Sequence, residues 1–238
     1  MPIIVLFDKK KFHTFVTTTN AWAQMNDAMI RECKLHGYTG FQFDFENIEW
    51  TDRDQLTKLV QISADALHQA GLQFTIATVP NAPGYPGAGG FAKWIYTDWR
   101  GAYDIAAIAK SVDLVCFMTY DQHTRWTMPG PVAGWDWTID NLNYALKVVP
   151  KEKPSLGIPL YGYHWYTGAP TEDTPSSPGH SAYFFFYRDQ MREWVFFTDL
   201  RTFQDRYQLV QKNNLQGFCS WVLGEEDPAI WKFLPTRH

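Results

Sequence analysis

The sequence lacks the features that mark a membrane protein or a nucleic-acid-binding protein. No apolar run approaches the roughly 20 residues that cross a bilayer, and no long basic run accompanies the net charge of −4. We therefore expect no membrane and no nucleic acid among its partners. The opening "MPIIVLFDKK" is too short and too soon charged for a signal peptide. The sequence itself thus leaves the location unknown.

Cysteine and histidine are also scarce. The three cysteines, Cys33, Cys116 and Cys219, lie in apolar segments without the spacing of metal ligands. This predicts buried thiols in preference to a disulfide framework. The histidines show no metal-ligand spacing either, so we expect no metal and no cofactor.

Aromatic residues, by contrast, are abundant. They make up 17% of the 238 residues and include 11 tryptophans, within 45% hydrophobic residues overall. This size and composition fit one domain over residues 1–238 with a sizeable core. Part of the tryptophan excess could stack on sugar rings. For the loop tryptophans, stacking and packing stay equally open; these are Trp126, Trp135, Trp137 and Trp165.

Short β-rich apolar runs alternate with helical patterns along the chain. Apolar residues at three- and four-residue spacing predict the helices, and the alternation predicts an α/β fold with a parallel sheet of the (β/α) TIM-barrel type. Six of the eight strands of such a barrel can be found, so we expect an incomplete barrel. The predicted strands are 2–7, 40–46, 73–79, 112–119, 155–161 and 216–222, and the predicted helices are 21–36, 53–70, 100–110, 138–148 and 199–213.

Three connections stand out from this repeat. The loops at 80–90 and 167–181 are long, rich in Gly and Pro, and follow predicted strands. Active sites of barrel enzymes lie at that end of the strands. A small β-hairpin is expected as an insertion at about 182–198, with its turn near Arg188–Gln190.

The stretch "GFQFDFE" alternates phenylalanines with Gln42, Asp44 and Glu46. Residues two apart on a strand share a face, about 6.6 Å apart. Two carboxylates so placed hold their pKa values apart, so that one is ionised while the other keeps a proton, as acid-catalysed glycosidic cleavage requires. A surface strand, or carboxylates that cap the next helix, would produce the same pattern.

Four motifs in order resemble glycoside hydrolase family 18, the chitinases and peptidoglycan hydrolases. In "TGFQFDFE", Gly40, Asp44 and Glu46 match the Asp-Gly-x-Asp-x-Asp-x-Glu signature, whereas Thr39 and Gln42 stand where the family usually has aspartates. The segments "VDLVCFMTYD", "LGIPLYG" and "GFCSWVLGEED" resemble the sixth, seventh and eighth strands of the family barrel. The resemblance covers most of residues 37–227 and implies that the first two barrel strands are absent.

The resemblance implies substrate-assisted retaining catalysis, in which the acetamido oxygen of the substrate is the nucleophile. Glu46 would be the general acid and then the base, Asp44 would stabilise the oxazolinium-like intermediate, and Tyr120 would orient the acetamido oxygen. Each residue also has a purely structural alternative, as a strand end, a turn cap or a core side chain. The substrate-binding residues implied are Gln42, Met118, Asp121, Tyr161 and Trp221.

The resulting hypothesis is a hydrolase of β-1,4-linked N-acetylglucosamine polymers, either chitin or peptidoglycan. The alternative is a catalytically weak or inactive sugar-binding protein on the same scaffold. Because glutamine carries no charge, Gln42 is expected to keep Asp44 ionised more readily than in relatives. Unpaired barrel edges leave self-association open, and the resemblance alone implies a secreted or cell-wall location.

Overall fold

The computed structural model describes residues 1–166 and 180–235. The chain divides into two compact units. The first comprises Met1–Phe117 with Asn143–Ser155, and the second comprises Met118–Leu142 and the residues from Leu156 onward. Each unit is described by itself below.

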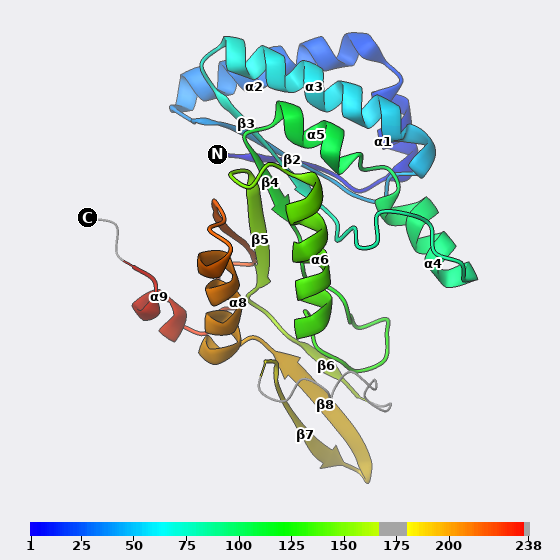
Figure 1. The fold of residues 1–238 in the computed structure, drawn as a ribbon, viewed down its shortest axis with the longest axis vertical. Coiled ribbons are helices and arrows are strands. Elements are labelled where there is room, and N and C mark those ends of the chain that lie inside the picture. The colour runs from blue at the N-terminus through cyan, green and yellow to red at the C-terminus, as the bar shows by residue number, and fades with distance from the viewer. Residues whose placement is uncertain (167–179, 236–238) are drawn as a thin grey trace. The chain divides into compact units, whose positions relative to one another are not determined.

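The first unit is built of parallel strands covered by helices (Figure 1). Neighbouring strands in it run in the same direction, in the order β1, β2, β3, β4. The strands are β1 (Ile3–Leu6), β2 (Gly40–Phe45), β3 (Gln73–Thr78) and β4 (Leu114–Phe117). The helices are α1 (Lys9–Val16), α2 (Thr19–His36), α3 (Arg53–Gln69), α4 (Gly90–Ile95) and α5 (Ile105–Ser111), with η1 (Trp50–Asp52) and the π-helical turn η2 (Tyr96–Arg100).

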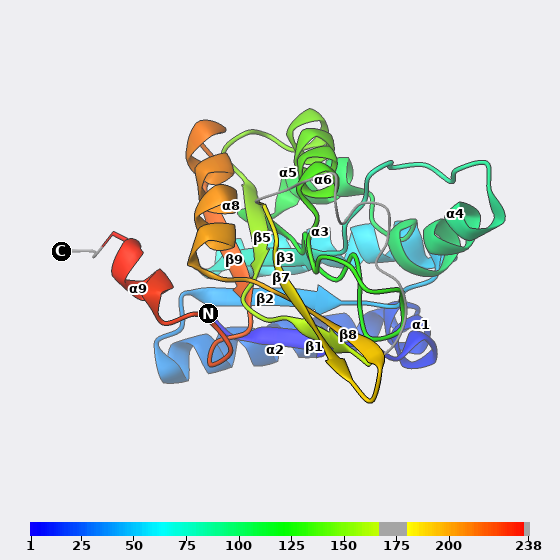
Figure 2. The ribbon, with the colours of Figure 1, turned by 90° about the horizontal axis from the view of Figure 1, so that it is seen from below.

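The phenylalanines of β2 form the centre of this unit's core. Phe41, Phe43 and Phe45 are buried. The ring of Phe43 packs against that of Phe74 on β3, with the ring centroids 4.6 Å apart. Figure 2 shows α2 and α3 running along the strands of this unit. The alternate residues of β2 face the other way, so the period of two read from the sequence separates an apolar face from a polar one.

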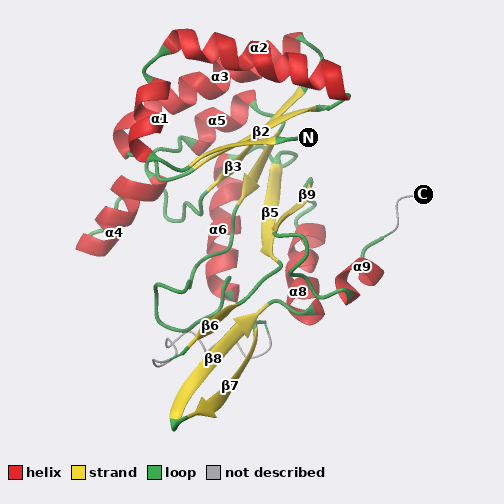
Figure 3. Cartoon of the chain, turned by 180° about the vertical axis from the view of Figure 1, so that it is seen from behind, coloured by secondary structure: helices red, strands yellow, loops and turns green. Residues whose placement is uncertain are grey.

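The second unit contains a three-stranded antiparallel sheet in the order β6-β8-β7 (Figure 3). Its strands β7 and β8 form the hairpin expected at 182–198, and the turn is Asp189–Gln190. The elements of this unit are β6 (Tyr163–Trp165), β7 (Ala182–Arg188), β8 (Met191–Phe197), α8 (Leu200–Lys212), β9 (Gly217–Trp221) and α9 (Ala229–Phe233). Strand β5 (Pro154–Pro159) and helix α6 (Trp135–Val148) each contribute residues to both units.

All six predicted strands are present in one sheet. Their hydrogen-bonded order is β1-β2-β3-β4-β5-β9, which confirms an α/β fold with an incomplete barrel. The order begins at β1, where Ile3 and Val5 are exposed, as is Phe7 directly after the strand. Each of the five predicted helices is also present, with its ends shifted by up to five residues.

Several expectations need correction or stay predictions. Cys116 and Cys219 are disulfide-bonded, and Cys33 is the buried free thiol, so the expectation of three thiols was wrong for two.

The segment 80–90 is an irregular loop up to the first residue of α4, whereas most of the predicted loop at 167–181 lies outside the described residues. The single catalytic domain over 1–238 stays a prediction. No helix in the described ranges has the length and apolar character of a membrane span.

Candidate active site

Three of the predicted site residues follow one another on the polar face of β2. Gln42 pairs with Ile3 and Asp44 with Val5 across the neighbouring strand. Glu46 comes directly after the strand, and its backbone N–H donates to the carbonyl of Leu6 at 3.1 Å. The sheet therefore fixes the backbone of both acids at the carboxyl end of β2.

Asp44 is almost completely buried, with 7% of its surface exposed. Its Oδ1 atom has no hydrogen-bond partner among the described residues. Burial raises the pKa of the Asp44 carboxyl because the charged form loses its hydration. A buried acceptor without a partner costs free energy. A bound molecule that donates a hydrogen bond to this oxygen would remove that cost.

Tyr103 is a neighbour of this acid pair that the sequence did not single out. Its buried hydroxyl donates a hydrogen bond to the carbonyl of Phe45, the last residue of β2. Burial, followed by the negative charges of Glu46 and Asp44, raises the pKa of Tyr103 far above its usual value. The hydroxyl thus stays neutral and holds the strand end that carries Glu46. Tyr103 lies in the loop before α5, inside the range 100–110 that was predicted to be helical, and no sequence pattern marked it as a neighbour of β2.

The side chain of Gln42 is hydrogen-bonded to β3. Its Oε1 accepts a hydrogen bond of 3.1 Å from the hydroxyl of Thr75 on β3, and the unpartnered Oδ1 of Asp44 receives nothing from it. Because burial raises the pKa of Asp44, the carboxyl is harder to ionise than an exposed aspartate. The structure therefore gives no support to the idea that Gln42 keeps Asp44 ionised.

The second unit contains a separate cluster of tyrosines around Asp121. One oxygen of Asp121 accepts hydrogen bonds from the hydroxyls of Tyr161 at 2.7 Å and Tyr163 at 2.8 Å. The ring of Tyr120 lies edge-on to that of Tyr161, with centroids 6.3 Å apart. Asp121 has a left-handed backbone with φ of 60°. Because its carboxylate holds two phenols, Asp121 does more than cap a turn.

Burial also changes the acidity of these phenols. Burial raises the pKa of Tyr161 beyond the accessible range, and the Asp121 carboxylate raises it further. Burial and the hydrogen bond to Asp121 raise the pKa of Tyr163 to about 12. Both groups therefore act as neutral hydrogen-bond donors. Tyr163 is a member of this cluster that sequence reasoning missed.

The remaining predicted residues of this unit differ in exposure. Met118 is nearly buried, and its carbonyl accepts from the backbone N–H of Tyr120 at 2.8 Å. Trp221, at the end of β9, is 51% exposed and is therefore not a core side chain. Among the tryptophans expected in loops, Trp165 is the last residue of β6 and packs against Trp194 in a buried cluster, whereas Trp126 is exposed.

Exposed aromatic side chains also follow the strands of the first unit. Trp50 comes four residues after Glu46, and Phe91 and Trp94 lie on α4 with their rings 5.8 Å apart. The high aromatic content of the sequence is the signal that could have pointed to them, but no pattern distinguishes them from core aromatics. As for metals, the described ranges bring together no three His, Cys, Asp or Glu side chains suited to an ion.

The chain belongs to the family of glycosyl hydrolases family 18. The model of that family matches residues 7–226, which is nearly the whole chain and includes both clusters. The family assignment and the six-stranded α/β sheet together confirm the resemblance drawn from the four motifs.

Relatives and solved structures agree with this assignment. The chain is 26% identical over 246 residues to the uncharacterized glycosylase YvbX of Bacillus subtilis, covering 95% of this chain and 69% of the relative. It is 28% identical to the cortical fragment-lytic enzyme of the same organism, covering 88% of this chain and 52% of the relative, so it spans about half of that protein. A chitinase structure from Chromobacterium violaceum matches with a TM-score of 0.81 and 25% identity, covering 97% of this chain and 77% of the other.

Proposed function

We propose that this chain is a glycoside hydrolase that cleaves β-1,4-linked N-acetylglucosamine polymers, chitin or peptidoglycan, by substrate-assisted retention. The observation that carries the proposal is Asp44, a buried carboxyl whose Oδ1 has no partner in the described chain, two residues before Glu46. An acetamido N–H is a donor that would satisfy this oxygen. Membership of family 18 supports the same reaction class.

In the proposed first step, Glu46 donates its proton to the glycosidic oxygen. The acetamido carbonyl oxygen attacks the anomeric carbon as the bond to the leaving sugar breaks. The product is an oxazolinium ion, whose positive charge Asp44 stabilises. Tyr120 is proposed to donate its phenol to the acetamido oxygen and to orient it.

In the second step, the Glu46 carboxylate takes a proton from water. The water oxygen attacks the anomeric carbon from the face that the leaving group vacated, while the bond between that carbon and the acetamido oxygen breaks and restores the acetamido group. The configuration is therefore retained. Asp121 has the proposed role of holding Tyr161 in place, which its hydrogen bond of 2.7 Å supports. Trp221 is proposed to stack under the sugar, which its exposed indole permits.

Hydrolysis of a fluorogenic N-acetylglucosamine oligosaccharide by the wild-type chain and by Glu46→Gln tests the proposal. The rate should fall about 100-fold or more, because general acid catalysis contributes that much. Equal rates would end the catalytic assignment. No activity in either protein, with retained binding of the oligosaccharide, would favour the sugar-binding alternative.

A further inference from the structure

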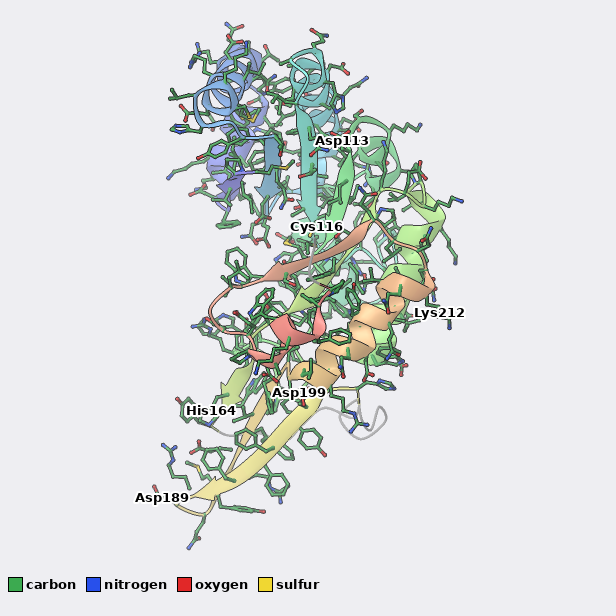
Figure 4. The ribbon with its side chains drawn as sticks, turned by 90° about the vertical axis from the view of Figure 1, so that its left-hand side faces the viewer. Asp113, Cys116, His164, Asp189, Asp199 and Lys212 are labelled. Carbon is green, nitrogen blue, oxygen red and sulfur yellow. The ribbon has the colours of Figure 1, made fainter. Side chains whose placement is uncertain are left out.

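Strand β7 is an edge strand with an unusual composition. In the described part of the chain, β8 is the strand that pairs with β7, and the order β6-β8-β7 leaves the other side of β7 outermost. Its seven residues read AYFFFYR, with a single charge at the end next to the turn. Figure 4 marks that turn by Asp189 at the tip of the hairpin.

The turn determines which backbone groups of β7 face outward. Asp189 and Gln190 have φ values of 48° and 67°, as in the two-residue turns typical of hairpins. The pair that flanks such a turn, Arg188 and Met191, is hydrogen-bonded. Because hydrogen-bonded and non-hydrogen-bonded pairs alternate, the residues that direct N–H and C=O away from β8 are Tyr183, Phe185 and Tyr187.

The side chains of this edge are exposed on both faces of the sheet. Tyr183, Phe184, Phe185 and Tyr187 each leave about half of their surface accessible. Natural edge strands are usually protected by a lysine, a proline, a bulge or a covering element. Within β7 none of the first three occurs. Such a strand is a template for pairing with another strand.

We propose that β7 pairs antiparallel with β7 of a second copy of this chain, about a two-fold axis at Phe185. The outward groups of Phe185 then bond to the same residue of the second copy. Tyr183 of one copy lies opposite Tyr187 of the other, and Phe184 opposite Phe186. Because the interface is isologous, all three outward-facing residues of each strand find partners.

The second copy fits this edge in side-chain chemistry and in charge. Every position from Tyr183 to Tyr187 places an aromatic ring opposite another, an arrangement that stabilises antiparallel pairs. Arg188 lies opposite Ala182 of the other copy, so no like charges face each other. The strand therefore complements itself.

The area involved determines how strong this association is. An aromatic side chain buries 150–250 Å², so four half-exposed rings offer about 400 Å² on each copy. The total of about 800 Å² lies below the 1,200 Å² of stable interfaces. The dimer is therefore weak and forms in a concentration-dependent way.

Sedimentation velocity on the full chain, over a range of concentrations, tests the proposal. The average mass should rise toward twice the monomer mass with concentration. Phe185→Lys should abolish this rise by placing two positive charges at the axis. Leu35→Lys, which changes an apolar side chain on α2 that is more exposed than Phe185, should leave it unchanged. Failure of the wild type to associate, or association that survives Phe185→Lys, would overturn the proposal.

Cysteine cross-linking tests the register of the two strands. This test does not depend on whether the fold tolerates a lysine at position 185. Opposed Cα atoms in a hydrogen-bonded antiparallel pair lie about 5.5 Å apart, within the range of a disulfide. Phe185→Cys should therefore give a covalent dimer with oxidised glutathione. Phe184→Cys should stay monomeric. In the proposed register Phe184 lies opposite Phe186, so the two introduced cysteines are two residues out of register. Equal cross-linking of both variants, or of neither, would contradict the proposed axis.

Discussion

Asp44 is the residue at which burial and charge conflict most directly. Burial raises its pKa in the folded chain above the value of about 3.9 for an unfolded aspartate. The stability that goes with the protonated carboxyl is thus present below about pH 3.9 and is lost as the pH rises through the folded-state pKa. A charged Asp44 at neutral pH therefore weakens the fold.

Asp44→Asn should separate stability from activity. The neutral amide removes the cost of burying a charge, so the variant should melt at a higher temperature than wild type at pH 7, with the difference closing toward about pH 3. Its hydrolytic rate should fall about 100-fold or more, as when a preorganised electrostatic group is lost. Asp65→Asn, at an exposed position on α3, is the control for melting. A variant less stable than wild type at pH 7 would contradict the assigned pKa direction.

Among the elements, β2 depends on its close approach to β3. A Cβ atom at Gly40 would lie 1.9 Å from the backbone oxygen of Gln73, whereas one at Gly217, the first residue of β9, would meet nothing within 4 Å. Gly40→Ala must therefore push two paired strands apart and should lower the free energy of unfolding by more than about 2 kcal/mol. Gly217→Ala should have little effect. Denaturant unfolding measures both, and equal stabilities would refute the packing argument.

The end of β2 is held in turn by Tyr103. Tyr103→Phe removes the hydroxyl that bonds to the Phe45 carbonyl and leaves a buried acceptor without its donor. The expected loss is about 1–3 kcal/mol of unfolding free energy. Tyr85→Phe, at an exposed tyrosine, is the matched control. An unchanged stability for Tyr103→Phe would mean that this hydrogen bond does not hold the strand.

Periodicity explains which elements the sequence could predict. The strict alternation at residues 41–46 and the regular apolar spacing of α3 identified both elements, because the apolar side chains of each share one buried face. Helix α4 was missed because it has six residues, none of them buried, and follows a loop rich in Gly and Pro. The contact of Tyr103 with β2 joins residues 58 apart in sequence, a separation that no local pattern encodes.

At the scale of the whole molecule, the open sheet leaves β1 as its first strand. The exposed side chains of Ile3 and Val5 on that strand, with Phe7 directly after it, form a surface that soluble proteins usually cover. We predict that the backbone amides of β1 exchange slowly with deuterium in the active protein, because another chain or segment pairs with this edge. Fast exchange of β1 in a compact, active monomer would contradict this.

The stereochemistry of the first product tests the central claim most directly. Proton NMR of a fresh reaction with an N-acetylglucosamine oligosaccharide separates the anomers before they equilibrate. If the acetamido group is the nucleophile and Glu46 serves as acid and then base, the new reducing end appears first as the β anomer. An α anomer as the first product, or no product at all, would contradict the account.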